Sequence, residues 1–458
     1  MATLAAMLKH RGLDVRGSDQ DVYPPMSEFL AAEGIPIVTG YREEHITADL
    51  DFVVVGNAIS RGNPELEAVL DRKVRYCSLP EALRDHFLWG ARSVVVAGTH
   101  GKTTTTSLAG WLLTHGGADP SVFVGGIARN FGPQGSSYRI GRGRDFVVEG
   151  DEYDSAFFDK TAKFLKYVPD IAVINNVEFD HADIYADLHA VTLAFRRLVN
   201  LVPRQGLLLV GADSPGAMAL RDRAVSRVAT FGTAPDADWQ AHDLEPAGAS
   251  TRFHVRRGGS PFGVFEVPLL GAHNVRNALA AIGVATEVGI GADRIGEGLR
   301  LFEGVRRRLE IVGVADGVTV YDDFAHHPTA VAETLAALRA SHPNARIWAV
   351  FEPRSASSCR RVFQEDFARA FAGADEVLIA PVFRSTLPEA ERLSVPRLVG
   401  DLHDRGQSAR GAESIDGIIS ALVAEHRAGD LAVIMSNGGF GGLHRRLLQA
   451  LASPQSVP

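Results

Sequence analysis

The stretch Gly98-Thr99-His100-Gly101-Lys102-Thr103-Thr104 combines glycines, a lysine and hydroxyl groups in a pattern suited to holding phosphate. An apolar, β-branched run at 93–96 precedes it and predicts a buried strand. Leu108 and Leu112 follow at helical spacing, and Gly116-Gly117 predicts the end of that helix. A strand, a glycine-rich turn and a helix together form the layout in which backbone N–H groups and a helix N-terminus bind phosphate.

In such a loop, Lys102 is expected to contact the β- and γ-phosphates of a nucleotide, and Thr103 to ligate Mg²⁺. Gly98 and Gly101 let the backbone N–H groups approach the phosphate oxygens closely. The loop is shorter than the usual G-x-x-x-x-G-K-[ST] pattern. The alternative is therefore an ordinary helix start that carries a lysine.

Two further predicted strands end in polar residues. Residues 146–148 run into Glu149 and an acidic cluster at 151–154, and residues 171–174 lead through two asparagines to His181. Carboxylates near phosphates hold hard cations, and parallel strands deliver their carboxyl ends to one crevice. Glu149 and His181 are thus candidates for a Mg²⁺ site, although His181 alternatively acts as a hydrogen-bonding partner, because Mg²⁺ prefers oxygen.

Other polar residues stand at the ends of expected elements. Ser18, Asp19 and Asn57 close predicted strands at 13–19 and 52–57, where a nucleotide sugar could bind, but the local sequence favours turn or cap roles.

A second pair opens an alanine-rich helix predicted through Val288. There, Asn274 is a candidate N-cap. Asn277 lies one turn further in, where an amide could read an adenine edge.

The composition limits the class of protein. The chain has 458 residues, which favours about three domains. Its net charge of −8 argues against general binding to nucleic acid or to anionic membranes. With Cys77 and Cys359 as its only cysteines, the chain lacks a disulfide framework and fits a reducing cytoplasm. It shows no apolar run of transmembrane length and no secretory signal.

The last part of the chain predicts another doubly wound α/β unit. Its strands are expected at 318–323, 347–351, 377–380 and 431–435, with a helix at 328–339 and a final helix after a glycine-rich turn. Arg354 follows one of these strands, where it could pair with a carboxylate of a bound peptide. The alternative is a surface ion pair.

Taken together, the chain resembles the Mur ligases, ATP-dependent enzymes of peptidoglycan metabolism that form amide bonds. The resemblance rests on five stretches in the same order and spacing, at 98–103, 149–154, 175–183, 271–277 and 321–328. Five motifs in order are far more specific than any one of them.

The resemblance implies an α/β fold of three domains. These are a Rossmann-like domain for the UDP-sugar (1–91), a central P-loop ATPase-like parallel sheet for ATP (92–304) and a C-terminal doubly wound domain for the acceptor peptide (305–458). The chain begins inside what resembles the first helix, so the first strand and glycine-rich loop of the Rossmann-like domain are expected to be missing. Because that loop helps to bind the UDP diphosphate in the family, we expect weakened binding of the nucleotide sugar.

Two members of the family use UDP-N-acetylmuramate as acyl donor: one adds L-alanine, and the other adds the recycled tripeptide L-alanyl-γ-D-glutamyl-meso-diaminopimelate. The chain resembles the second, notably at 23–27, 56–64, 151–160 and 178–183. The expected activity is thus ATP- and Mg²⁺-dependent ligation of the tripeptide in the cytoplasm, for murein recycling, with small-molecule partners and no membrane insertion. Alternatives are the L-alanine ligase, a non-catalytic nucleotide-binding homologue and a generic phosphate-loop ATPase.

The resemblance also implies roles for single residues. The expected catalytic residues are Lys102, Glu149 and His181, and the expected metal ligands are Thr103, Glu149 and His181. Ser18, Asp19 and Asn57 match UDP-sugar positions, and Arg354 lies in the domain that binds the peptide. The ATP-binding positions are matched by Gly98, Thr99, His100, Gly101, Lys102, Thr103, Thr104, Asn274, Asn277, Arg308 and Asp322, with Asp323 as the alternative to Asp322. For the arginine run at 306–308, the alternative is a solvated charged face.

Overall fold

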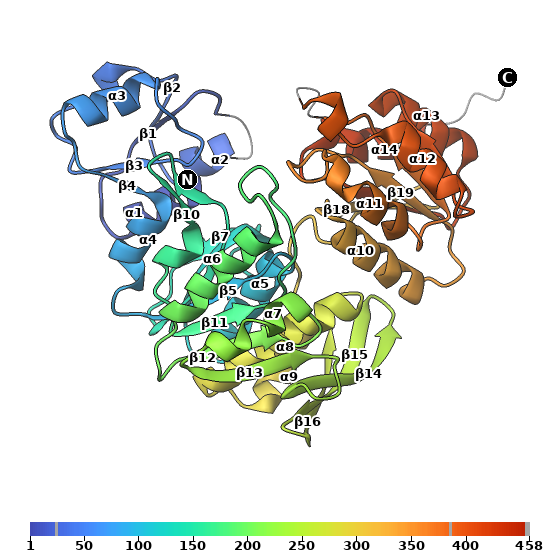
Figure 1. The fold of residues 1–458 in the computed structure, drawn as a ribbon, viewed down its shortest axis with the longest axis horizontal. Coiled ribbons are helices and arrows are strands. Elements are labelled where there is room, and N and C mark those ends of the chain that lie inside the picture. The colour runs from blue at the N-terminus through green and yellow to red at the C-terminus, as the bar shows by residue number, and fades with distance from the viewer. Residues whose placement is uncertain (23–25, 384–386, 454–458) are drawn as a thin grey trace. The chain divides into compact units, whose positions relative to one another are not determined.

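A computed structural model describes residues 1–22, 26–383 and 387–453 (Figure 1). Tyr23, Pro24 and Pro25 of the stretch at 23–27 therefore lie outside the described residues. The chain folds into two compact units. The first comprises Met1–Glu178, His189–Gln240 and Leu279–Gly298, and the second comprises Phe179–Leu188, Ala241–Ala278 and Leu299–Pro458. Within the described ranges, every helix is too short or too polar to span a lipid bilayer.

The first unit starts with two small parallel sheets. β1 (Gly17–Asp19) pairs with β2 (Ile37–Thr39), and β3 (Val53–Val55) pairs with β4 (Tyr76–Ser78). The predicted strand at 13–19 forms only from Gly17, because no described strand pairs with the residues before it. The described strands of this part form two separate pairs, whereas a Rossmann-like domain has a single parallel sheet. The helices of this part are α1 (Ala2–His10), α2 (Met26–Ala32), α3 (Pro64–Asp71) and α4 (Leu79–Leu83).

A larger sheet in the first unit positions the predicted phosphate loop. This sheet has ten described strands, and seven of them follow the order β13-β12-β11-β5-β8-β6-β7, in which all neighbours are parallel except β6 and β7. β5 (Arg92–Ala97) lies between β11 (Ile171–Ile174) and β8 (Asp145–Glu149), and its valines are fully buried, as the apolar run predicted. Because these three strands are parallel, their carboxyl ends meet at one edge of the sheet.

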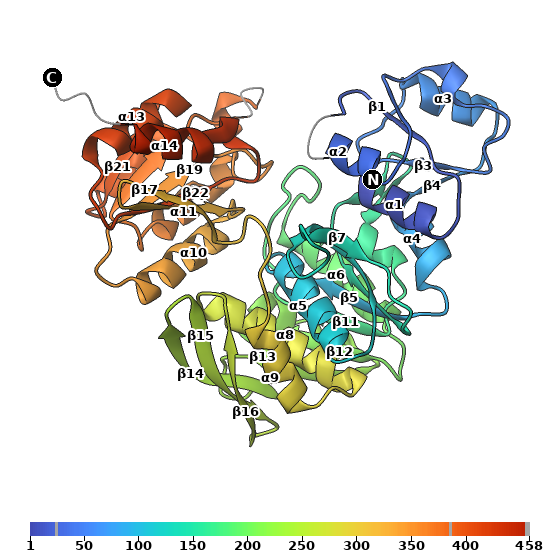
Figure 2. The same cartoon turned by 180° about the vertical axis from the view of Figure 1, so that it is seen from behind.

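Helices cover both faces of this sheet. α6 (Leu188–Leu201) lies over the face seen in Figure 1, and α5 (Lys102–His115) over the face seen from behind in Figure 2. Trp111 on α5 donates a hydrogen bond from Nε1 to the Gly298 carbonyl oxygen of α9 at 2.8 Å. The other elements of this region are β6 (Ser121–Ala128), β7 (Ser136–Arg139), β9 (Asp154–Ala156), β10 (Asp159–Ala162), β12 (Leu207–Gly211), α7 (Pro215–Met218), β13 (Arg227–Gly232), α8 (Ala272–Val288) and α9 (Ala292–Arg300).

The segment at 239–267 consists of β-strands joined by short turns. β14 (Trp239–Ala247) begins parallel to β13, and β15 (Ser250–Arg257) pairs antiparallel with β16 (Ser260–Val267). The helix predicted through Val288 is α8 and ends at that residue.

The second unit contains a sheet with the order β17-β18-β22-β19-β20-β21, in which only β17 and β18 are antiparallel. All four predicted strands are present, whereas β17 and β21 at the two edges were not predicted. The strands are β17 (Glu310–Ala315), β18 (Val318–Asp323), β19 (Ile347–Phe351), β20 (Glu376–Ile379), β21 (Ser408–Gly411) and β22 (Leu431–Met435). The helices are α10 (Pro328–Ser341), α11 (Gln364–Ala370), α12 (Val395–His403), α13 (Ile415–Glu425) and α14 (Leu443–Ala452).

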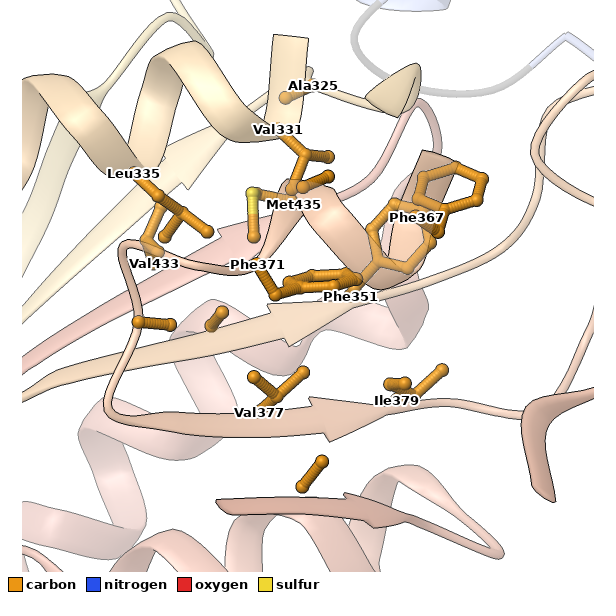
Figure 3. Packing of buried hydrophobic residues seen from close by; sticks show 14 of the residues in the cluster. Ala325, Val331, Leu335, Phe351, Phe367, Phe371, Val377, Ile379, Val433 and Met435 are labelled. Atoms are coloured by element: carbon orange, nitrogen blue, oxygen red, sulfur yellow. The ribbon is translucent and has the colours of Figure 1, made fainter. Parts of the chain in front are cut away.

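Alternating side chains of these strands build one core on each face of the sheet. Phe351, Val433 and Met435 pack with Val331 and Leu335 of α10, with Phe367 of α11 and with Phe371, which directly follows α11 (Figure 3). The alternate strand residues pack against α13 and α14 on the other face. This two-sided burial is the reason that the strands read as continuous apolar runs in the sequence.

Candidate active site

The turn between β5 and α5 has the backbone conformation of a phosphate-binding loop. Gly101, which precedes the first residue of α5, has a φ of 78°, and Gly98 has a φ of 136°. A Cβ atom at Gly98 would lie 3.0 Å from the Asn175 Cβ and 3.1 Å from the Asn175 backbone nitrogen. Both the left-handed backbone and this close approach require glycine. The loop therefore packs directly against the end of β11.

Gly98→Ala is expected to destabilise the protein by about 2 kcal/mol, because it adds backbone strain and a clash with Asn175. It should also weaken ATP binding, since the loop must move. The matched control is Gly117→Ala, because Gly117 has a φ of 85° with open space around it. Urea denaturation and calorimetric titration with ATP check both variants. ATP affinity that is equal in the two variants would contradict this role of Gly98.

Residues after β11 hold the loop through hydrogen bonds. The His100 backbone N–H donates to Asn176 Oδ1 at 2.7 Å, and the Asn175 side-chain amide donates to the His100 carbonyl oxygen at 3.2 Å. The Thr99 hydroxyl oxygen accepts from the Glu178 backbone N–H at 2.9 Å. The polar end of β11, which the sequence marked as a ligand-binding edge, thus also fixes the shape of the loop.

The Lys102 ammonium forms hydrogen bonds with the loop and with a carboxylate next to it. Its Nζ donates to the carbonyl oxygens of Gly98 and Thr99, at 2.8 and 3.2 Å, and to Glu152 Oε1 at 2.9 Å. Burial lowers the pKa of Lys102, but the carboxylates of Glu152 and Asp151 more than offset this, so the pKa is raised above its ordinary value. Lys102 is therefore a charged donor where phosphate is expected. Glu152 was absent from the predicted site residues, although it lies in the acidic cluster noted in the sequence.

Glu149 and Thr103 lie side by side. The Thr103 hydroxyl donates to Glu149 Oε1 at 2.9 Å, and the Gly125 backbone N–H donates to Oε2 at 2.7 Å. A Cβ atom at position 125 would lie 2.9 Å from Oε1, so a glycine there leaves room around the carboxylate. Burial raises the pKa of the Glu149 carboxyl above its ordinary value. A hydroxyl and a partly buried carboxylate at a phosphate loop form the oxygen donor set that Mg²⁺ prefers, so these residues fit the ion.

A third carboxylate at this strand end has a different partner. Asp151 forms an ion pair with Lys163 at 2.8 Å and accepts the Tyr153 backbone N–H at 3.2 Å. Thr104, the remaining loop residue of the predicted set, is buried in the first turn of α5.

His181 belongs to the second unit and lies just before a turn. Its backbone has a φ of 52°, which is uncommon outside glycine, and its N–H donates to Asp180 Oδ1 at 2.7 Å. The side chain is buried. Such a conformation persists where the surroundings enforce it, and it is typical of functional sites.

Asn274 and Asn277 are buried on the first turns of α8. The Asn277 amide donates to Asn274 Oδ1 at 3.1 Å, and the Asn274 amide donates to the Leu270 carbonyl oxygen at 2.9 Å. The suggestion that Asn274 is an N-cap is wrong, because α8 begins at Ala272 and the Asn274 amide instead donates to a carbonyl that precedes the helix.

In the arginine run, Arg307 makes the contact with Asp322. Its Nε lies 3.2 Å from Asp322 Oδ2, and its Nη2 donates to two carbonyl oxygens of the loop at 436–438, each at 2.7 Å. Arg308, the predicted residue, holds its guanidinium 4.9 Å from the centre of the Phe324 ring.

Arg354 follows β19 and packs against the glycine-rich turn. Its guanidinium lies 3.6 Å from the centre of the Phe383 ring and 3.4 Å from Glu352 Oε1. A Cβ atom at Gly438 would lie 2.1 Å from Arg354 Nε, so the glycine is needed for this approach. The guanidinium is thus held by an aromatic face and a buried carboxylate, an arrangement that goes beyond the simple surface ion pair considered for it.

The predicted UDP-sugar residues lie at the ends of the short N-terminal strands. The Ser18 hydroxyl donates to the Glu65 carboxylate, and Asp19 Oδ1 accepts from the Tyr41 hydroxyl at 3.0 Å. Asn57 is exposed, two residues after β3. These partners of Ser18 and Asp19 lie 47 and 22 residues away in the sequence, whereas the hydrogen bond from the Gln20 backbone N–H to Asp19 Oδ1, at 2.7 Å, is a local contact of the kind a turn makes.

Comparison with known proteins identifies the family. The Mur ligase middle domain matches residues 96–285, the Mur ligase glutamate ligase domain matches 307–438 and the Mur ligase family catalytic domain matches 1–88. In addition, the chain is 39% identical over 461 residues to the UDP-N-acetylmuramate–L-alanyl-γ-D-glutamyl-meso-2,6-diaminoheptandioate ligase of Escherichia coli, covering 99% of this chain and 96% of that protein. The chain belongs to the Mur ligase family. The expected three-domain α/β fold is therefore confirmed.

Other relatives of this Mur ligase include proteins named as L-alanine ligases and a protein named as a murein peptide ligase. The UDP-N-acetylmuramate–L-alanine ligase of Salinibacter ruber is 38% identical over 414 residues, covering 89% of this chain and 83% of that protein. Among solved structures, a murein peptide ligase from Psychrobacter arcticus is 33% identical with a TM-score of 0.72, covering 100% of this chain and 97% of that chain. A UDP-N-acetylmuramate–alanine ligase from Thermotoga maritima is 25% identical with a TM-score of 0.79, covering 98% and 96%.

Proposed function

We propose that this Mur ligase joins the lactyl carboxylate of UDP-N-acetylmuramate to the tripeptide L-alanyl-γ-D-glutamyl-meso-diaminopimelate, with cleavage of ATP to ADP and phosphate, in murein recycling. The loop that places Lys102 beside Glu149 and Thr103 supports the reaction class. The choice of acceptor rests on one observation, the 39% identity over almost the whole length to the Escherichia coli tripeptide ligase.

In this reaction, the lactyl carboxylate attacks the γ-phosphorus of ATP, and ADP leaves. The amine of the L-alanine residue then attacks the carbonyl carbon of the acyl phosphate, loses a proton and expels phosphate. The protein contributes by positioning and by neutralising charge. The Lys102 ammonium and the backbone N–H groups at the start of α5 are the donors for the transferred phosphoryl group.

Thr103 and Glu149 would hold Mg²⁺, with His181 as the family-derived third ligand, and the bound ion would neutralise charge on the phosphate oxygens. The adenine is assigned to Asn274 and Asn277, and further ATP contacts to Arg308 and Asp322. The UDP-sugar is assigned to Ser18, Asp19 and Asn57, and a carboxylate of the peptide to Arg354. We place the domain boundaries after residues 91 and 304, and the reaction in the cytoplasm, which supplies ATP and the nucleotide sugar.

The acceptor is tested by measuring ADP release with ATP, Mg²⁺ and UDP-N-acetylmuramate, with either the tripeptide or free L-alanine. We expect kcat/KM for the tripeptide to exceed that for L-alanine at least about 100-fold, because an acceptor site built for a peptide leaves its polar groups unpaired with the smaller ligand. The L-alanine ligase is the second candidate, favoured by the 38% identity to the Salinibacter ruber protein. A preference for L-alanine would establish that alternative and overturn the proposal.

A further inference from the structure

The side chain of Glu152 is only 2% exposed, yet it carries no role in the reaction outlined above. Both of its oxygens face the Lys102 ammonium, with Oε1 at 2.9 Å and Oε2 at 2.8 Å from Nζ. The remaining acceptors of Nζ are the loop carbonyls of Gly98 and Thr99. An ammonium has three N–H donors, so one carboxylate and two loop carbonyls fix its position from three sides.

The neighbouring carboxylates hold other groups. Glu149 accepts from the Thr103 hydroxyl and a backbone N–H of β6, and Asp151 pairs with Lys163. Glu149 and Asp151 therefore each have partners of their own, and the direct ion pair with Lys102 is formed by Glu152. A buried carboxylate destabilises the folded state unless a cation pairs with it. Removing Lys102 would therefore leave the Glu152 charge buried and uncompensated.

We propose that Glu152 is the positioning residue for Lys102, which it aims at the transferred phosphoryl group without itself touching the nucleotide. When ATP binds, phosphate oxygens can replace the Gly98 and Thr99 carbonyl oxygens as acceptors of Lys102 Nζ, while Glu152 remains in its ion pair with the ammonium. The inference rests on the proposed function, in which Lys102 contacts the phosphates of ATP.

If Glu152 has this role, its removal should affect the binding of ATP and the rate of turnover differently. Without the carboxylate, Lys102 can still contact bound phosphates, and a negative charge near the triphosphate is removed, so ATP binding should not weaken. The ammonium is no longer held where charge develops in the transition state, so kcat should fall. A merely structural carboxylate would leave this balance between KM and kcat unchanged.

The test compares Glu152→Gln with the wild-type enzyme by steady-state ADP release. We expect kcat to fall at least about tenfold, while KM for ATP stays the same or decreases. Glu152→Asp keeps the charge on a shorter side chain and should recover part of the lost kcat. Asp145→Asn is the matched control, because Asp145 is equally buried in an ion pair with Arg92 at the opposite end of β8. This control should keep both kinetic constants within about twofold.

Two outcomes overturn the proposal: unchanged kcat in folded Glu152→Gln, or a raised KM for ATP with unchanged kcat. A double-mutant cycle with Lys102→Met covers the case of poor folding, because two residues acting as a unit give losses of kcat that do not add. Additive losses would also contradict the inference. The assay uses whichever acceptor, tripeptide or L-alanine, the wild-type enzyme accepts. Failure of the proposed acceptor therefore appears in the wild-type enzyme, whereas failure of the Glu152 role appears only in the variants.

Discussion

Lys102→Met is expected to lower kcat for ADP release by about 100- to 1,000-fold, the loss typical of removing one donor to the charge that develops in a transition state. The methionine keeps an unbranched apolar stem, one atom shorter than lysine, but loses the ammonium that Gly98, Thr99 and Glu152 hold at the loop. The measurement is steady-state ADP release at saturating substrates, in protein shown to be folded by its thermal melting curve.

Loss of stability must be separated from loss of catalysis in this variant. Lys102→Met leaves Glu152 buried without its cation, which should cost about 3 kcal/mol in the free energy of unfolding. Adding Glu152→Gln should restore much of that stability without restoring turnover. Lys166→Met is the control for a lysine in a partly buried ion pair, here with Asp159 at 2.6 Å, and should keep kcat within about twofold of the wild type. Full turnover in folded Lys102→Met would refute the role of Lys102.

Glu149→Gln is expected to lower kcat by about 100-fold and to raise the Mg²⁺ concentration needed for half-maximal activity. The amide keeps the size of the side chain and can accept from the Gly125 N–H and donate to the Thr103 hydroxyl, but it loses the charge that attracts a divalent cation. ADP release measured over a series of Mg²⁺ concentrations checks this. An unchanged Mg²⁺ dependence would remove Glu149 from the metal site.

The same variant should be more stable than the wild type in the absence of metal at pH 8. Because burial raises the pKa of Glu149 in the folded state, the unfolded state releases this proton more readily. Stability of the wild type therefore falls as the pH rises from the unfolded-state pKa through the folded-state pKa. The amide introduced by Glu149→Gln does not titrate, so the advantage of the variant should disappear toward about pH 3, below the ordinary pKa of a Glu carboxyl, where the Glu149 carboxyl of the wild type is protonated in both states. Melting temperatures in EDTA across this pH range provide the readout.

The sequence predicted the loop and the strands around it well, because the signals were local. The apolar run at 93–96, the turn glycines and the helical spacing of Leu108 and Leu112 each correspond to an observed element. In the second unit, Val331, Leu335 and Leu338 share the buried face expected for their helix. Doubly buried strands leave strong apolar patterns, and glycines at left-handed positions leave strong turn signals.

Contacts between residues that are distant in the sequence could not be predicted from such local signals. The acidic cluster at 151–154 gave no indication that Glu152 is the residue that meets Lys102, since neighbouring side chains point in different directions. For the same reason, the arginine run at 306–308 gave no indication that Arg307 is the residue that pairs with Asp322. The short strands β1 to β4 have few buried side chains, so their pairing into two separate sheets left little periodic signal.

The most direct test of the central claim is a competition experiment. The wild-type enzyme is given ATP, Mg²⁺ and UDP-N-acetylmuramate with equal concentrations of the tripeptide and L-alanine, and the UDP-linked products are separated by mass spectrometry. The proposed function predicts that the tripeptide adduct dominates, with one ADP formed for each adduct. A product mixture dominated by the L-alanine adduct would contradict it.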